Sequence, residues 1–153
     1  IWSLARKSGA SGMVLGQALD IEAETSAKQL EIEEISKLQE YKTGKLISWS
    51  CEVGPILAGE STEPFALYAS KIGLAFQIID DILDVTSSSK TLGKKVGKDT
   101  DKNKATFVSK LGLDNSRKKA KELVSEACEA ISGFKERSRN LCQIANFIVS
   151  RRF

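Results

Sequence analysis

Apolar residues recur along this chain at helical spacing, and no stretch alternates between apolar and polar residues as a half-buried strand does. This pattern predicts helices over residues 1–24, 36–58, 64–87, 114–131 and 139–151, with a short helical piece over 105–112. The helix over 64–87 is apolar on nearly every face, so we expect it to be buried. We therefore predict an all-α helical bundle that spans residues 1–153 as part of one domain.

Glycine, proline and serine mark where the predicted helices bend or stop. Gly9, Gly12 and Gly16 interrupt the first helix, and each glycine costs about 1 kcal/mol relative to alanine. Close helix packing is the ordinary reason to tolerate them. Pro55 is predicted to kink or break the helix over 36–58. Two further boundaries are predicted: serines 87–89 end the central helix, and Asp114 caps the next one.

Composition narrows the class of protein. The chain is 41% apolar and 28% charged, as expected of an ordinary globular protein, and its net charge of +3 is too small to indicate a nucleic-acid partner. No apolar run reaches the roughly 18 residues of a membrane span. Histidine is absent, which excludes histidine catalysis within this chain. Cys51, Cys128 and Cys142 have no metal-binding spacing, so we expect reduced core thiols and a cytoplasmic protein.

Candidate chemistry concentrates in the second half of the central helix. Asp80, Asp81 and Asp84 stand in an otherwise apolar run, Phe-Gln-Ile-Ile-Asp-Asp-Ile-Leu-Asp over residues 76–84. On a helix, spacings of three and four residues put these carboxylates on one face about a turn long. Buried carboxylates must be paired or bind a metal. Mg²⁺ takes carboxylate oxygens and keeps waters and substrate phosphates as further ligands.

A lysine-rich loop follows this aspartate cluster. It is punctuated by glycine and contains Lys94, Lys95, Lys98, Lys102 and Lys104. An acidic cluster followed by a basic loop predicts a metal-bridged polyanion, most simply a diphosphate. Each feature has an ordinary alternative, which is an exposed acidic helix face in the first case and a solvated loop in the second. The apolar neighbours of the carboxylates favour the ligand site.

The run over residues 76–84 resembles the second aspartate-rich motif of the trans-isoprenyl diphosphate synthases. Gly-Gln-Ala-Leu-Asp at 16–20, Lys-Thr-Gly at 42–44 and Leu-Gly-Lys at 92–94 fall in the order of this family and at about its spacing. The resemblance runs over nearly all of the chain, but it covers only the C-terminal half of the usual family length. It implies an incomplete helical bundle of the isoprenoid synthase type. Residues 16–24 are most similar to the branch that makes farnesyl diphosphate, with geranylgeranyl or longer-chain synthases as the alternative.

The resemblance implies head-to-tail prenyl transfer from an allylic diphosphate to isopentenyl diphosphate, with Mg²⁺ as cofactor and a homodimer as the usual assembly. It assigns Mg²⁺ to Asp80, Asp81 and Asp84, with Asp80 as the main ligand. Diphosphate contacts are assigned to Lys42, Thr43, Gln77, Lys94 and Lys104. The cavity wall would include Gln17 and Asp20, and the catalytic residues would be Asp80, Asp81 and Lys42.

The chain also departs from this family. The synthases carry two aspartate-rich motifs on facing helices, and the sequence contains only the second, so we expect the chain alone to be an inactive fragment. Tyr41 stands where many members have histidine. Arg151-Arg152-Phe153 forms a basic end, by default a frayed tail, although some members direct such residues to the homoallylic diphosphate. Two other classes stay open: a non-catalytic synthase-like subunit, and a helical scaffold that binds no ligand.

Overall fold

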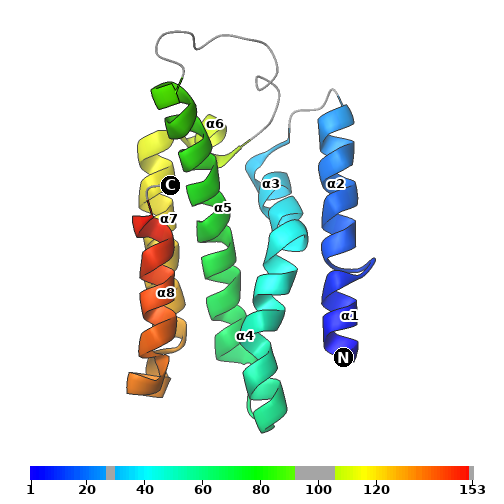
Figure 1. Ribbon diagram of the computed structural model, residues 1–153, viewed down its shortest axis with the longest axis vertical. Coiled ribbons are helices and arrows are strands. Elements are labelled where there is room, and N and C mark those ends of the chain that lie inside the picture. The colour runs from blue at the N-terminus through cyan, green and yellow to red at the C-terminus, as the bar shows by residue number, and fades with distance from the viewer. Residues whose placement is uncertain (27–29, 92–105, 152–153) are drawn as a thin grey trace.

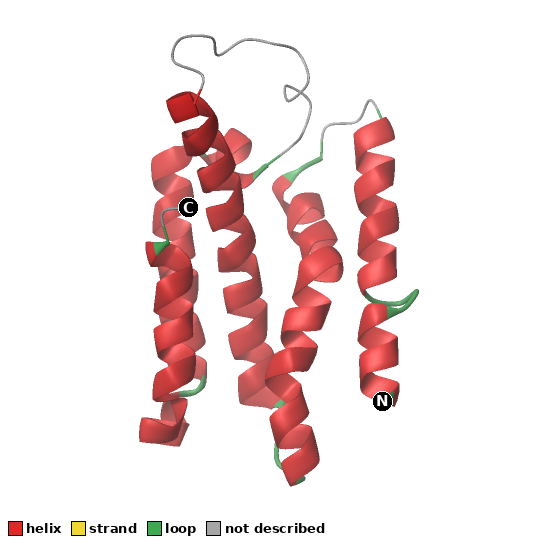
Figure 2. Cartoon of the chain, viewed as in Figure 1, coloured by secondary structure: helices red, strands yellow, loops and turns green. Residues whose placement is uncertain are grey.

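A computed structural model describes residues 1–26, 30–91 and 106–151, except for the side chains of residues 87–91. Every regular element in this described part is helical, which confirms the all-α fold (Figures 1 and 2). The elements in chain order are α1 (Trp2–Ser8), α2 (Met13–Thr25), α3 (Ile32–Gln39), the π-helical turn η1 (Glu40–Gly44), α4 (Lys45–Ala58), α5 (Glu63–Thr91), α6 (Phe107–Leu111), α7 (Leu113–Ala130), the 3₁₀ segment η2 (Ser132–Ser138) and α8 (Arg139–Ser150).

Helix α5 lies at the centre of the bundle. It packs against α4 on one side and against α7 and α8 on the other, and the turn η1 lies between α5 and α2 (Figure 1). Helices α1 and α2 form the opposite edge, where α1 contacts α4. None of the helices described is both long enough and apolar enough to cross a membrane.

The apolar residues of α5 supply most of the core. Tyr68, Ile72, Ile78 and Ile82 are buried, and α7 contributes residues such as Leu123 to the same cluster. Burying one large apolar side chain stabilises a fold by about 1.5–3 kcal/mol, so this helix pair accounts for much of the stability of the bundle. The sequence-based expectation that the central helix is buried is therefore confirmed.

A glycine allows α2 to approach η1 closely. A Cβ atom added to Gly16 would lie 2.1 Å from the backbone nitrogen of Lys42 and 2.6 Å from the carbonyl carbon of Tyr41. Atoms at these distances overlap, so a larger side chain would push the two elements apart. Close packing is thus the reason for this glycine, as the sequence indicated.

Several predicted boundaries differ from the structure. Residues 1–24 form two helices because the chain turns at residues 9–12, and α3 already begins at Ile32, where the Glu31 amide donates to the Glu34 carboxylate at 3.0 Å. The serines at 87–89 do not end α5, which continues to Thr91. This prediction was wrong because serine can remain in a helix by bonding a preceding carbonyl, as Thr86 Oγ1 does with Ile82 at 2.8 Å.

Pro55 does not break its helix, the stronger of the two outcomes predicted for it, and the predicted cap at Asp114 was wrong. Pro55 lies inside α4, and the helix ends one turn later, where the Glu60 amide donates to the Pro55 carbonyl at 3.0 Å and Gly59 has a φ of 70°. Helix α7 begins at Leu113, so Asp114 lies in its first turn. There its carboxylate still favours the helix, because negative charge is stabilised near a helix N-terminus.

The three cysteines pack against the core near Tyr68, whose hydroxyl donates to the Leu141 carbonyl at 2.7 Å. Burial raises the pKa of Cys51 to about 11, with a smaller contribution from Glu52. Burial, followed by a hydrogen bond with Cys142, raises the pKa of Cys128 to about 12. The Cys51 and Cys128 thiols therefore stay protonated at neutral pH, as expected of core filler.

We expect the Cys51 thiol to resist modification in the folded chain. At pH 8 a thiol with a pKa of about 11 has roughly one hundredth of the thiolate of an unperturbed cysteine. Reaction with a disulfide reagent, followed at 412 nm, should be about a hundredfold slower in buffer than in urea. Since folding raises this pKa from its ordinary value of 9.0, the stability that the thiol contributes should be complete below about pH 9 and lost towards pH 11. Equal rates in both solvents would contradict the assigned burial.

We also expect Gly16→Ala to lower the free energy of unfolding by about 1–3 kcal/mol, because the new methyl group overlaps the Lys42 backbone. Gly133→Ala is the control. A Cβ at this position in η2 would meet nothing within 4 Å, so the change should be close to neutral. Urea denaturation of both variants tests the comparison. Equal effects would contradict the close approach of α2 to η1.

Candidate diphosphate and metal site

The turn η1 positions Lys42 beside α2. Its ammonium lies 2.5 Å from Asp20 Oδ2, and the two side chains are 27% and 13% exposed. The structure thus brings together two predicted site residues that are 22 positions apart in the sequence. An ammonium has three donors and this ion pair uses one of them, so Lys42 can also donate to an anion from its exposed side.

The π-helical form of η1 was missed by the sequence-based prediction, which expected a regular helix over residues 36–58. A π turn inserts an extra residue into a helix and often lies at a functional site. Here it contains Lys42 and Thr43, both half-buried. Gln77 is half-buried on α5, and Gln17 is exposed on α2 one turn before Asp20.

The three aspartates of α5 have different surroundings. Asp80 Oδ1 pairs with the Arg151 guanidinium, and Asp81 Oδ2 accepts the backbone N–H of Phe107 at 2.9 Å. Asp84 is exposed one turn further along. Asp80 and Asp81 are partly buried, and a cation or a donor offsets the contact with water that each carboxylate has lost.

The donor set suits a hard divalent cation that arrives with other ligands. Within the described residues, no three acidic or cysteine side chains lie close enough together to hold a metal by themselves. Mg²⁺ does not need such a cage, because it commonly takes one or two carboxylates together with waters and phosphate oxygens. Asp80 already attracts a positive group, which shows that this end of α5 accepts added positive charge.

The contact of Arg151 with Asp80 was missed by sequence reasoning. The basic end of the chain was assigned by default to a frayed tail, with the homoallylic diphosphate as the alternative that the resemblance offered. Arg151 instead follows α8 directly and reaches Asp80, 71 positions earlier in the sequence. Its Cζ atom also lies 4.3 Å from the centroid of the Phe76 ring. The only sequence signal for this residue was its membership of a basic terminus, and that pattern does not identify a partner.

Two predicted lysines, Lys94 and Lys104, lie outside the described residues, and so does the motif at 92–94. Their assignment to diphosphate stays a prediction. Every other assignment to diphosphate, metal or cavity wall stays a prediction as well, because the structure places these residues without showing what they bind: Gln17, Asp20, Lys42, Thr43, Gln77, Asp80, Asp81 and Asp84.

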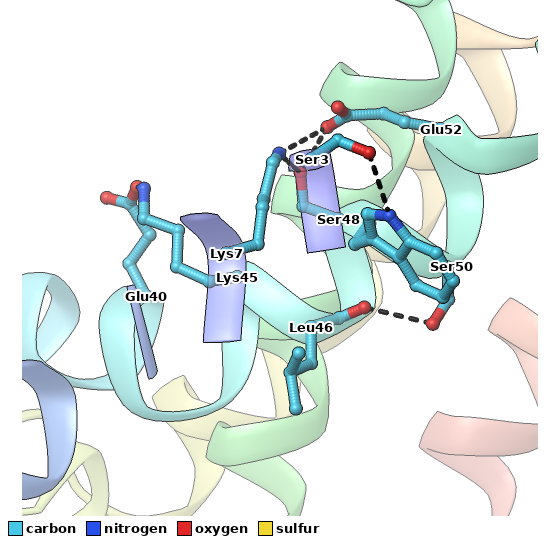
Figure 3. A network of polar contacts seen from close by, with 9 residues as sticks. Ser3, Lys7, Glu40, Lys45, Leu46, Ser48, Ser50 and Glu52 are labelled. Atoms are coloured by element: carbon cyan, nitrogen blue, oxygen red, sulfur yellow. Dashed lines mark hydrogen bonds and ion pairs between the residues drawn. The ribbon is translucent and has the colours of Figure 1, made fainter. Parts of the chain in front are cut away.

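A second polar network lies away from these residues. Lys7 of α1 donates to Ser48 Oγ at 2.6 Å and pairs with Glu52 at 2.8 Å (Figure 3). A pocket of about 490 Å³ opens near it between α3, η1, α4 and α5, and its wall includes Glu40 and Lys45. These two side chains pair with each other at 2.5 Å, and none of the predicted site residues lines the pocket. The hydrogen bond and the ion pair of Lys7 connect α1 to α4.

Comparison with known proteins identifies the class to which this fold and site belong. The sequence model of the polyprenyl synthetase family matches residues 6–144. The chain therefore belongs to the polyprenyl synthetase family, and its similarity to this family extends through both the Lys42 turn and the aspartate cluster of α5.

Individual relatives include synthases with different products. The chain is 38% identical to farnesyl diphosphate synthase of Escherichia coli, covering 99% of this chain and 52% of that protein. It is 40% identical to geranylgeranyl diphosphate synthase of Cyanophora paradoxa, with 99% and 51% covered. The chain thus spans about half the length of the relatives it matches.

Solved structures agree with this assignment. An FPP/GFPP synthase from Zymomonas mobilis superposes with a TM-score of 0.84 at 38% identity, over 97% of this chain and 49% of that one. A Helicobacter pylori geranyltransferase, solved in complex with magnesium and isoprenyl diphosphate, has a TM-score of 0.72 at 33% identity, over 96% and 48%. The isoprenoid synthase type of bundle predicted for this chain is confirmed.

We expect the Lys42–Asp20 pair to be energetically coupled. Because both side chains are mostly buried, Lys42→Met and Asp20→Asn should each destabilise the fold by about 1–2 kcal/mol, and the double variant should lose less than the sum. The exposed pair Lys118–Glu122, at 4.0 Å, is the control and should show a coupling near zero. Urea denaturation of the single and double variants measures the coupling free energy of each pair. If the losses from Lys42→Met and Asp20→Asn simply add in the double variant, the two side chains are not coupled.

Proposed function

We propose that this chain is the diphosphate- and metal-binding half of a Mg²⁺-dependent trans-prenyltransferase, which joins isopentenyl diphosphate to an allylic diphosphate. The observation that supports it most is the position of η1, which packs between the helix of Asp20 and the helix of Asp80. The proposed anion-binding lysine and the proposed metal-binding carboxylate therefore belong to neighbouring elements. This arrangement suits a substrate whose diphosphate contacts both a cationic side chain and a metal.

Each proposed residue has a physical task. Lys42, held by Asp20, would donate to the diphosphate, and Thr43 would add a hydroxyl beside it. Lys94 and Lys104 would neutralise further phosphate oxygens, and Gln77 would contribute an amide near the carboxylates. Fixed donors of this kind stabilise the charge that develops on a leaving group. Gln17 would line the same cavity.

Asp80 would be the main Mg²⁺ ligand, and Asp81 and Asp84 would bind the cation directly or through water. Bound Mg²⁺ supplies a positive charge that stabilises the departing diphosphate. The Phe107 N–H fixes one oxygen of Asp81, so this side chain is oriented before any ligand arrives. The reaction needs no histidine if the released diphosphate itself accepts the proton.

The product and the assembly also belong to this proposal. We favour farnesyl diphosphate, because residues 16–24 are most similar to that branch, while geranylgeranyl diphosphate is the alternative that the Cyanophora relative supports. Chromatography of the products of the complete protein separates the two. We further propose a cytoplasmic homodimer in which residues equivalent to the other half of the relatives complete the site.

We expect the chain to bind a non-hydrolysable farnesyl diphosphate analogue only in the presence of Mg²⁺. Asp80→Ala should abolish this Mg²⁺-dependent binding or weaken it strongly, because the proposed main ligand is removed. Calorimetric titration with Mg²⁺ and with a chelator measures both effects. Equal affinity for the analogue with Mg²⁺ and with chelator would contradict the metal site. No binding by the folded chain would favour a helical scaffold. Binding without prenyl transfer by the complete protein would favour a non-catalytic subunit.

The role of Lys42 can be tested separately. Lys42→Met should weaken binding of the same analogue by about tenfold, since a charge-assisted contact to phosphate is lost. Lys45→Met is the matched control. Lys45 lies three positions away and pairs with Glu40, outside the proposed site. Equal affinities for the two variants would remove Lys42 from the diphosphate site.

A further inference from the structure

The end of α8 brings an arginine onto the carboxylate that the proposed function assigns to the metal. Arg151 pairs with Asp80, and its guanidinium lies over the Phe76 ring with Cζ 4.3 Å from the centroid. The Arg151 side chain is 20% exposed and that of Asp80 is 42% exposed. An arginine in this position is held from two sides, by the negative charge of a carboxylate and by the electron-rich face of an aromatic ring.

The surroundings of Arg151 do not satisfy the whole guanidinium. Its Nε atom is buried, and it has no hydrogen-bond partner in the part of the chain that the structure describes. A buried donor without an acceptor weakens an ion pair, because its lost contact with water is not replaced. The pair can therefore form in the ligand-free chain and still be replaced by a cation that Asp80 binds better.

We propose that Arg151 is a displaceable counterion of Asp80, which neutralises this carboxylate before a divalent cation binds and leaves it when the cation arrives. This inference rests on the proposed function, because it takes Asp80 as a metal ligand. The guanidinium and the cation compete for the same carboxylate, and their positive charges repel each other at short distance. Phe76 acts through Arg151, as the platform that keeps the guanidinium in place.

The partial exposure of the Arg151–Asp80 pair limits how much Arg151 can weaken the binding of a cation. Partly exposed ion pairs contribute at most a modest amount of free energy. Removing Arg151 should therefore tighten divalent-cation binding by about twofold to fivefold. A change of this size is large enough to measure and small enough to leave the metal able to displace the arginine.

The experiment is a titration of the 153-residue chain with Mn²⁺, an oxygen-preferring substitute for Mg²⁺ whose free ion is counted by electron paramagnetic resonance. Arg151→Gln should bind Mn²⁺ about twofold to fivefold more tightly than wild type. Arg139→Gln removes the same charge at the far end of α8, where the side chain is 71% exposed, and should leave the affinity unchanged. Asp80→Asn should weaken Mn²⁺ binding in wild type and in each of the arginine variants.

Two further variants separate direct competition from a general effect of charge. Phe76→Leu and Arg151→Lys both keep the net charge but remove the stacking between guanidinium and ring, so each should also tighten Mn²⁺ binding, though by less than Arg151→Gln. A long-range charge effect predicts no change in either. Circular dichroism verifies that every variant is folded, and Arg151→Lys provides the comparison if the half-buried position Phe76 does not tolerate leucine.

The outcomes distinguish this inference from the proposed function. Tighter binding by Arg151→Gln and by a charge-conserving variant supports displacement. Suppose that wild type binds Mn²⁺ through Asp80. If Arg151→Gln then has the same affinity as wild type, or if only variants that remove a positive charge change the affinity, the counterion role is overturned and the metal site stands. If neither wild type nor any variant binds Mn²⁺, the metal-binding part of the proposed function is overturned, and the displacement with it.

Discussion

The partial burial of Asp80 and Asp81 on α5 is the constraint on which the rest of the site depends. This helix packs against α4, α7 and α8, yet its second half contains three carboxylates. Desolvating a carboxylate is costly unless a donor or a cation replaces the lost water. The Phe107 N–H at the start of α6 and Arg151 after α8 provide those groups, so the placement of two other elements is tied to the charge of the central helix.

Two ion pairs of opposite arrangement flank the proposed site. On the α2 side, the acid Asp20 holds the base Lys42, whose positive charge would face the diphosphate. On the α8 side, the base Arg151 holds the acid Asp80, whose negative charge would face the metal. Each pair satisfies its buried partner while leaving capacity for a ligand. The first pair depends on the close approach of Gly16 to the Lys42 backbone, because a Cβ atom at position 16 would push α2 and η1 apart.

The sequence was sufficient to predict the all-helical bundle and the buried central helix. These features depend on local periodicity and on residue type, both of which can be read from a short window. The packing role of Gly16 was also predictable, since few other reasons retain a glycine inside a helix. Resemblance to the synthase family then linked Asp20 and Lys42 to one site, although nothing local indicates that these two side chains touch.

The remaining features depend on tertiary packing. Asp80 and Arg151 are 71 positions apart, and their contact exists only because α8 returns along α5. The π turn at η1 has the same apolar spacing as an ordinary helix, so periodicity cannot reveal its extra residue. The serines after Thr86 failed as a stop signal because a hydroxyl can satisfy a helix carbonyl as readily as it can end a helix.

The arrangement of carboxylates also bears on the form in which a metal would be bound. No three acidic side chains converge within the described residues, so protein oxygens alone would leave most of the coordination shell of Mg²⁺ to water. A diphosphate held by Lys42 would bring further oxygens and negative charge to the same region. Metal and diphosphate would therefore each raise the affinity for the other, and a site of this kind selects a metal–diphosphate complex over either component.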